Sequence, residues 1–250
     1  MNKERGSCSV ADLVYKKVMQ NLKDRIRAND FENNRLPDER TLSEELGVSR
    51  SSIKRALGIL AEEGVIFKKR GSGTFVNPLY LKNKSIFRYE GSNLGITNNL
   101  KKEGYNPTIK VLDFKVIPAP KEVKENLFLQ SEEFVYEIKR LRLLNDQGII
   151  IENSYIPIKI APALTKEIVS HSLFDYFAKE LHHTGTKSFM SIETQPSNKN
   201  DQAFLDLKPT EPVGIMEGVF FLDDGTPFEV STMRIHYKYF SYNTFVNLSD

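Results

Sequence analysis

The sequence predicts an α+β protein made of a small helical N-terminal part and a larger, mainly antiparallel β part. Apolar residues recur at helical spacing before residue 64, whereas β-prone segments alternate with turn signals after residue 80. Residues 1–80 hold 15 Lys/Arg and 11 Asp/Glu, a net charge of +4, and residues 81–250 hold 20 and 22, a net charge of −2. The 250 residues with 40% apolar content suffice for two folded domains and exclude wholesale disorder.

Three helices are predicted in the first 64 residues. An apolar stripe with a spacing of four residues indicates the first helix and consists of Val14, Val18, Leu22 and Ile26. Asp38 is placed to cap a second, short helix that Gly47 ends. Ser49 is placed to cap a third helix that runs to Gly64. Two β-prone segments, 65–67 and 74–76, then flank a basic turn and predict a hairpin.

The second and third helices have the spacing of a helix-turn-helix, in which the start of the second helix enters the DNA major groove. The polar residues at that position are Ser49, Arg50, Ser51, Ser52, Lys54 and Arg55. Arg can pair with guanine O6 and N7, and Ser hydroxyls suit phosphates. The hairpin adds Lys68, Lys69 and Arg70, followed by Gly71, Ser72 and Gly73. A generic three-helix fragment with a solvated basic face is the alternative, and the basic hairpin argues against it.

Five separated motifs in this part carry a family resemblance. They are Leu36-Pro37-Asp38-Glu39-Arg40, Leu46-Gly47-Val48-Ser49-Arg50, Arg55-Ala56-Leu57, Leu60-Ala61-Glu62-Glu63-Gly64 and Gly71-Ser72-Gly73-Thr74-Phe75-Val76. Residues 10–77 thereby resemble the winged-helix domain of GntR-family bacterial transcription regulators. The resemblance implies that Arg40 and Arg50 contact bases or nearby phosphates, that Lys54 lies on the groove face and that Gly71 enters the minor groove. Lys54 replaces a common Arg of the family and lacks its planar fork.

The second part is predicted to form a mainly antiparallel sheet with a few helices. The predicted strands are 107–117, 133–144, 148–158, 187–194, 213–222 and 227–239. The predicted helices are 121–128, 172–181, 200–207 and a short helix that Thr97 caps and that ends near Gly104. Turn signals at 145–148 and 223–225 join neighbouring strands as hairpins.

Arg140 and Arg142 lie two residues apart in a predicted strand, so both side chains lie on one face of the sheet. Two guanidinium groups on one face form a clamp for phosphate or carboxylate. The candidate partners are Glu137 on the same strand, Glu152 on the next strand and Glu229 on the last strand. The arginines could equally form solvated cross-strand salt bridges with such carboxylates. The residue pattern alone leaves both interpretations open.

A second resemblance covers residues 90–248. The motifs are Gly104-Tyr105-Asn106-Pro107, Arg140-Leu141-Arg142, Glu152-Asn153-Ser154-Tyr155-Ile156-Pro157, Ser172-Leu173-Phe174-Asp175-Tyr176-Phe177 and Asp224-Gly225-Thr226-Pro227-Phe228-Glu229. They resemble the UTRA effector domain of the HutC subfamily, whose antiparallel-sheet fold is similar to that of chorismate lyase. The resemblance implies a phosphate site made of Gly95, Ile96, Thr97, Arg140, Arg142 and Ser172. It implies sugar-hydroxyl contacts from Glu152 and Glu229, with Ile235 in place of a pocket Tyr.

We therefore expect a winged helix-turn-helix domain at 1–77, a linker at 78–90 and an effector-binding and dimerisation domain at 91–250. The predicted function is a ligand-responsive transcription regulator, a repressor that binds a palindromic DNA operator as a homodimer. A small anionic effector such as a sugar phosphate would release or re-orient it. The alternatives are an enzyme of chorismate-lyase-like fold and an effector-independent DNA-binding dimer.

The absence of several sequence motifs argues against an enzyme, a metalloprotein and a secreted or membrane protein. No nucleophile elbow, metal motif or Ser-His-Asp set is recognisable, so we predict no catalytic residue, metal or cofactor. The single cysteine, Cys8, excludes an intrachain disulfide and fits a reducing compartment. The N-terminus lacks the apolar core of a signal peptide, and no apolar run reaches the ~18 residues of a spanning helix. We expect a cytoplasmic protein without a membrane partner.

Overall fold

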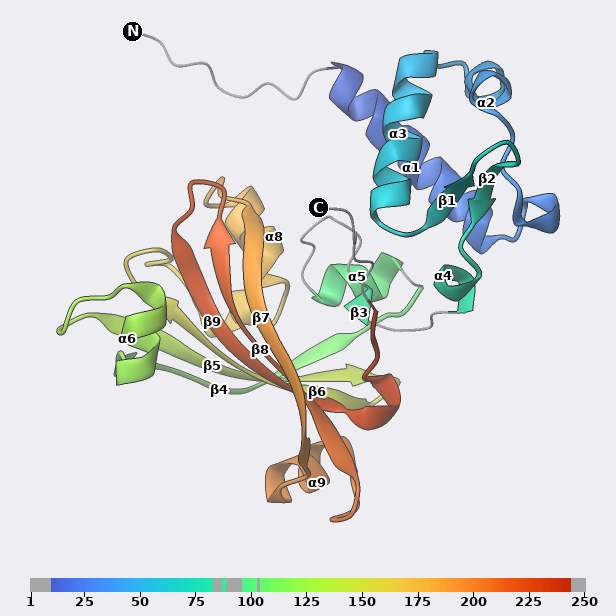
Figure 1. Cartoon of the computed structure of the whole chain (residues 1–250). Helices are drawn as coiled ribbons and strands as arrows, with labels where there is room; N and C mark the ends of the chain where they lie inside the picture. Colours follow the sequence, from blue (N-terminus) through green and yellow to red (C-terminus); the bar gives the residue numbers. More distant parts are fainter. Residues whose placement is uncertain (1–9, 83–86, 89–95, 103, 244–250) are drawn as a thin grey trace, which may run out of the picture. The chain divides into compact units, whose positions relative to one another are not determined.

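The computed structural model describes residues 10–82, 87–88, 96–102 and 104–243 of the chain. They divide into two compact units, with the boundary between residues 84 and 85 (Figure 1). The first unit is helical with a small hairpin, and the second contains an antiparallel sheet with helices. The predicted α+β class is confirmed. Among the described residues, no helix is long and apolar enough to cross a membrane.

The first unit follows the predicted order of helix, helix, tight turn, helix and hairpin. Its elements are α1 (Val10–Arg27), η1 (Glu32–Asn34), α2 (Glu39–Leu46), α3 (Arg50–Glu62), β1 (Ile66–Lys69), β2 (Gly73–Val76) and α4 (Pro78–Lys82). Asp38 caps α2 by accepting a 2.8 Å hydrogen bond from the Thr41 amide. Ser49 caps α3 by accepting a 3.2 Å bond from the Ser52 amide. Gly47 ends α2 in the left-handed conformation, with φ of 62°, as predicted.

The core of the first unit contains the predicted apolar stripe. Leu22 and Ile26 of α1 are buried against Ile53 and Leu57 of α3. Burying these side chains stabilises the unit by roughly 1.5–3 kcal/mol each. Tyr80 of α4 packs into the same core, so the unit continues past residue 77, where the sequence analysis ended it. The expected linker at 78–90 thus contains α4 and the two-residue strand β3 (Phe87–Arg88).

The second unit is built on a six-stranded sheet with the order β4-β5-β6-β9-β8-β7. Its strands are β4 (Thr108–Pro118), β5 (Phe134–Leu144), β6 (Gln147–Pro157), β7 (Gly185–Pro196), β8 (Pro212–Leu222) and β9 (Pro227–His236). All neighbouring pairs are antiparallel. The hairpin turns fall where the turn signals predict them, with positive φ at Asn145, Asp146 and Gly225. A separate pair joins β3 to β10 (Tyr242–Asn243).

Helices cover both faces of this sheet, because alternate residues of a strand point to opposite sides. They are α5 (Ile96–Lys102), α6 (Lys121–Leu127), α7 (Lys166–Val169), α8 (Leu173–Lys179) and α9 (Lys199–Leu205). On one face, Ile138 of β5 belongs to the core that contains Phe177 of α8. On the other face, Val135 of β5 packs with Leu127 of α6, and α9 packs further along that face.

Two expectations differ from the structure for local reasons. The last long strand ends at His236 rather than at residue 239, and a 3₁₀ turn, η2 (Tyr237–Tyr239), follows it. The His236 imidazole accepts a hydrogen bond from the Lys238 amide, which fixes this turn. Thr97 lies inside the first turn of α5 and does not cap it. Its hydroxyl instead contacts the sheet, as described below.

Helix α9 is held to the sheet by one buried ion pair. Asp201 is fully buried and accepts from Nε and Nη2 of Arg234 on β9, at 2.8 and 2.7 Å. Asp201 also completes a capping box with Asn198 at the start of α9. One carboxylate therefore both caps the helix and binds it to its strand.

Removal of Arg234 should leave a buried carboxylate without its partner. Arg234→Met is expected to lower the free energy of unfolding by about 3–5 kcal/mol. Lys121→Met is the control, because Lys121 lies 3.9 Å from Glu125 in an exposed pair, and exposed pairs contribute about 0–1 kcal/mol. Urea unfolding of both variants measures the difference. Equal small losses would show that the buried pair does not hold α9.

Candidate effector site and DNA-binding surface

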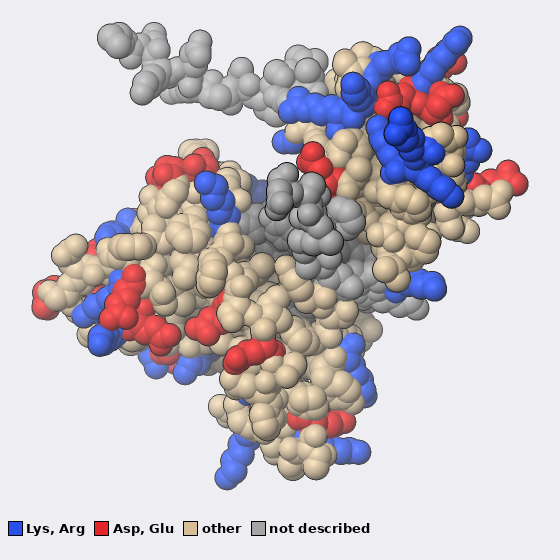
Figure 2. Space-filling model, in the orientation of Figure 1, with Lys and Arg blue, Asp and Glu red and all other residues tan. Residues whose placement is uncertain are grey.

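The exposed face of α3 carries the first group of predicted DNA-binding residues. Arg50, Ser51 and Lys54 are exposed, whereas Ile53 and Leu57 of the same helix are buried in the core. Arg50 and Lys54 are four residues apart and so share one side of the helix. Lys and Arg side chains gather on the visible face of this unit (Figure 2). The helix is thus oriented with its basic side to solvent.

Other residues predicted to bind DNA contact neighbouring side chains of the first unit. The Ser49 hydroxyl caps α3 and lies 2.9 Å from the hydroxyls of both Ser51 and Ser52. Arg40 forms a 2.9 Å pair with Glu44, and its side chain is 77% exposed. Such an exposed pair contributes little, so a DNA phosphate can replace Glu44 at small cost. Arg55 stacks on the Tyr15 ring, with its Cζ 4.0 Å from the ring centroid.

The predicted hairpin tip consists of Arg70, Gly71 and Ser72 between β1 and β2. Gly71 has φ of 74°, a conformation that favours glycine. Gly73 also has positive φ, and a Cβ there would lie 3.2 Å from Nε of Arg35. Arg35 therefore packs against the base of the hairpin. The sequence analysis missed this residue, since no local pattern places it beside β2.

The second unit contains a buried ion-pair network on the face predicted for the arginine clamp. Arg140 and Glu152 are directly opposite in the β5–β6 register. Glu152 Oε2 accepts from Nη2 of Arg140 at 2.7 Å and from Nη2 of Arg142 at 3.0 Å. The three residues are only 2%, 5% and 5% exposed. The cross-strand pairing with Glu152 that sequence left open is therefore present, and it is buried rather than solvated.

Each arginine also contacts a segment outside the sheet. Nη1 of Arg140 donates to the carbonyl oxygens of Val169 and His171, at 3.2 and 3.3 Å. Nη1 of Arg142 donates to the Thr97 hydroxyl on α5. The network thus fixes both α5 and the loop between α7 and α8 on the sheet. We call Arg140, Arg142, Glu152 and Glu229 the buried charge cluster.

The protonation state of Glu229 determines the net charge of this cluster. It is 2% exposed and forms a hydrogen bond with the Ser154 side chain. Burial, together with the nearby charge of Glu152, raises the pKa of Glu229 to about 7. Burial acts in the same direction on Glu152, but the charges of Arg140 and Arg142 outweigh it and lower the pKa of that carboxyl. Below neutral pH the cluster therefore holds two cations and one anion.

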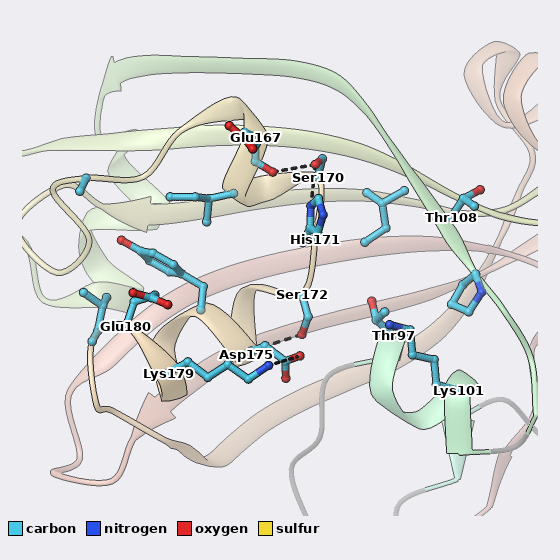
Figure 3. Close-up of a pocket in the computed structure, with 16 residues that line it drawn as sticks. Thr97, Lys101, Thr108, Glu167, Ser170, His171, Ser172, Asp175, Lys179 and Glu180 are labelled. Atoms are coloured by element: carbon cyan, nitrogen blue, oxygen red, sulfur yellow. Dashed lines mark hydrogen bonds and ion pairs between the residues drawn. The ribbon is translucent and has the colours of Figure 1, made fainter.

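Figure 3 shows a cleft of about 980 Å³. Two of its lining residues contact the buried charge cluster: Thr97 accepts from Arg142, and the His171 carbonyl accepts from Arg140. Its labelled lining residues are Thr97, Lys101, Thr108, Glu167, Ser170, His171, Ser172, Asp175, Lys179 and Glu180. Ser172 caps α8 by accepting from the Asp175 amide at 3.3 Å. The Asn98 amide donates to Asp175 at 2.7 Å and joins α5 to α8. The cleft therefore lies between two short helices that the cluster helps to hold.

The structure brings only some of the predicted effector residues to the cleft. Thr97 and Ser172 line it, whereas the four members of the buried charge cluster lie behind its wall. Ile235 does not line it: this side chain is fully buried with Leu100 and Met216, because its strand position pairs with Ile150 in the core. Ile96 packs against that core as well. Gly95 lies outside the described residues.

Several cleft residues were missed by the sequence analysis, among them Lys101, His171, Tyr176 and Lys179. Tyr176 and Lys179 lie one turn apart on α8, on the side that follows Ser172, and this spacing was the available signal. Lys101 and His171 come from other elements and had none. Within the described ranges, no three His, Cys, Asp or Glu side chains are grouped to hold a metal ion.

Comparison with known proteins decides the family. The profile described as "Bacterial regulatory proteins, gntR family" matches residues 14–76, and the profile "UTRA domain" matches residues 102–241. The chain belongs to the GntR family of bacterial transcription regulators. Its UTRA domain places it in the HutC-type subfamily, so the resemblance drawn from the motifs is confirmed. A regulator of this type combines a DNA-binding domain with an effector-binding domain.

Individual GntR-family relatives align over most of their length. The chain is 30% identical to the HTH-type transcriptional regulator GmuR of Bacillus subtilis, over 88% of this chain and 92% of the relative. It is 27% identical to the HTH-type transcriptional repressor NagR of the same organism, over 86% and 87%. The crystal structure of YydK from B. subtilis matches with a TM-score of 0.77 and 30% identity, over 94% of this chain and 99% of that chain.

The raised pKa of Glu229 predicts a pH dependence of stability. Between the ordinary value of 4.5 and about 7, the unfolded chain ionises this group while the folded chain keeps it protonated. The free energy of unfolding therefore falls as pH rises through this window, by about 3 kcal/mol in total. Glu229→Gln should remove this loss, whereas Glu122→Gln on exposed α6 should keep it. Urea unfolding from pH 4.5 to 7.5 tests this, and an identical pH trend with and without Glu229 would contradict it.

Proposed function

We propose that this regulator is a repressor that binds a palindromic operator as a homodimer in the cytoplasm and is released by a small anionic effector such as a sugar phosphate. The observation that carries this proposal is the buried charge cluster, net positive below neutral pH, which contacts the cleft residues Thr97 and His171. The repressor role is supported by NagR, a named repressor that aligns over most of both chains.

An anion in the cleft would meet hydroxyl donors and an uncompensated positive charge. Thr97 and Ser172 supply the hydroxyls, and the two arginines supply the charge. Because the two arginines are buried, their charges act more strongly than charges in water would. The buried Nε atoms of both arginines have no hydrogen-bond partner among the described residues, so each side chain keeps a donor for a ligand.

The same contacts offer a route from effector to DNA. An anion that draws Arg142 away from Thr97 would loosen α5, the first helix of the effector unit after the segment that joins the two units. An anion that draws Arg140 away from the Val169 and His171 carbonyls would loosen the loop before α8. Release from DNA then follows if the effector binds the loosened state more tightly than the DNA-bound state.

The DNA-binding half of the proposal predicts a sequence-specific effect at α3. Arg50→Ala should weaken binding to an operator selected from random duplexes by about 1–3 kcal/mol, because a bidentate contact to guanine is lost. Binding to random DNA should change less. Lys121→Ala, far along the chain on α6, is the control and should alter neither. Fluorescence anisotropy at fixed salt measures both affinities. An equal loss on operator and random DNA would contradict base reading by Arg50.

The effector-binding part of the proposal predicts that two helix-cap variants differ in their thermal shift with ligand. Glucose 6-phosphate at about 100 times its dissociation constant adds ~2.7 kcal/mol, which raises the melting temperature by about 5–10 °C. Ser172→Ala should reduce this shift strongly. Thr165→Ala is the matched control, since Thr165 caps α7 at 3.2 Å but does not line the cleft. Both variants should lose about 1 kcal/mol of stability.

Other results of this thermal-shift measurement would favour the alternatives. No shift with any phosphorylated sugar or organic acid would favour an effector-independent DNA-binding dimer. Consumption of chorismate by the purified protein would favour an enzyme, and we expect none, since the relatives named above are transcription regulators.

A further inference from the structure

Arg35 lies in a short third strand beside the hairpin of the first unit. Its backbone pairs with Phe75 of β2 in an antiparallel bridge, and the Leu36 amide donates to the Thr74 carbonyl oxygen at 2.9 Å. Residues opposite each other in antiparallel strands share one face, so the Arg35 side chain lies on the face of Phe75 and Gly73. A segment that precedes α2 in the chain thereby adds a cation to the hairpin.

The guanidinium group of Arg35 lies over Gly73, where the hairpin turn ends and β2 begins. A Cβ at Gly73 would lie 3.2 Å from Nε, 3.5 Å from Nη2 and 3.8 Å from Cζ of Arg35. Lys69 of β1 is the cross-strand partner of Gly73 and so lies on the same face. Arg35 and Lys69 therefore flank a position that has no side chain, and all three residues are exposed. We call Arg35, Lys69 and Gly73 the hairpin notch.

The shape of the hairpin notch is fixed by its surroundings. Gly73 has φ of 117°, a conformation that residues with a side chain rarely adopt. Phe67 of β1 and Phe75 of β2 stack across the two strands, with ring centroids 5.8 Å apart. Such cross-strand aromatic pairs stabilise a hairpin. The space between Arg35 and Lys69 is therefore kept open by the backbone rather than by chance.

The two cations of the hairpin notch differ from their neighbour Lys68. Lys68 points to the other face and pairs with Glu39 at 3.3 Å. Arg35 and Lys69 form no ion pair with any residue in the part of the chain that the structure describes. Both side chains therefore keep all their donors for an external anion.

The surroundings favour a phosphate of the DNA backbone over a small free anion. A hollow of about 630 Å³ adjoins Arg35 and Gly73, and its other lining residues include the acidic Glu32, Asp38 and Glu39. These carboxylates would repel a free anion that has no other contact. A DNA duplex bound at the exposed face of α3 and at the hairpin tip has such contacts, and these hold its phosphates in place.

We propose that the hairpin notch binds one backbone phosphate of the DNA beside the hairpin tip. A phosphate oxygen approaches Gly73, where no side chain blocks it, while Arg35 and Lys69 donate from the two sides. The contact positions the hairpin on the duplex and carries no base information. This inference rests on DNA binding by the first unit, and it requires neither a palindromic operator nor an effector.

Fluorescence anisotropy of the full chain at several salt concentrations tests this assignment. Arg35→Met removes the charge and keeps an unbranched side chain. It should weaken binding to operator and random duplexes equally, by about tenfold. The slope of log affinity against log salt should become shallower by about 1 for each bound subunit. Arg35→Lys should keep the slope and lose less affinity, because it keeps the charge without the planar fork.

Lys82→Met is the matched control for these variants. Lys82 is an exposed cation of the same unit, on α4, which follows the end of β2 away from the hairpin turn. Its loss should change affinity less than twofold and leave the salt slope unchanged. Thermal unfolding of all variants should match that of the unmodified chain, since both side chains are exposed.

Uncharged replacements in the DNA locate the contact without changing the protein. Methylphosphonate is introduced at one phosphate at a time along the duplex. One position for each bound subunit should weaken binding of the unmodified chain, and Arg35→Met should be insensitive to that same replacement. Equal sensitivity of both proteins at every position would overturn the assignment.

The remaining outcomes separate this inference from the proposed function. An Arg35→Met variant with the affinity and salt slope of Lys82→Met would overturn the hairpin notch as a phosphate site. A loss confined to the operator would overturn it as well, since that result indicates a base contact. Equal binding of the unmodified chain to operator and random duplexes would instead contradict the operator proposal, while the effect of Arg35→Met on random DNA would still decide the role of the notch.

Discussion

The effector unit depends on the burial of two guanidinium groups beside one shared carboxylate. Moving a charged group out of water costs several kcal/mol unless a partner compensates it. Glu152 provides that partner for both Arg140 and Arg142, and the backbone carbonyls of Val169 and His171 accept further hydrogen bonds from Arg140. The ion pairs join β5 to β6, and the remaining donors hold α5 and the loop before α8. The contacts that hold the fold together therefore also hold two elements that line the candidate effector cleft.

The protonation state of Glu229 determines whether the buried charge cluster is positively charged or neutral. With the Glu229 pKa at about 7, only Glu152 opposes the two arginines below neutral pH. The cleft is thereby backed by excess positive charge without an exposed arginine. Under the proposed function, this arrangement favours an anionic ligand over a neutral one.

Local patterns in the sequence predicted most of the fold. Caps at Asp38, Ser49 and Ser172 use only neighbouring residues, and alternation along one strand places Arg140 and Arg142 on the same face. Their burial could not be predicted this way, because it depends on the β5–β6 register and on the helices that cover this face.

The cleft itself was even less accessible to prediction. Its walls come from α5 and α8, which are more than 70 residues apart in the chain and meet through Asn98 and Asp175. Short elements such as α7 carry too few residues for a periodic pattern. Ile235 was assigned to the pocket by resemblance alone, and its place in the core follows from pairing with Ile150.

The most direct test of this account is proton uptake on anion binding. Calorimetric titration of the full chain with glucose 6-phosphate at pH 7.5, in two buffers of different ionisation enthalpy, measures the protons bound with the ligand. An anion beside the buried charge cluster should raise the pKa of Glu229 further, because like charge disfavours its ionised form. We predict a net proton uptake that Glu229→Gln removes. The same uptake in both proteins would contradict the account, since the anion would then bind away from the buried charge cluster.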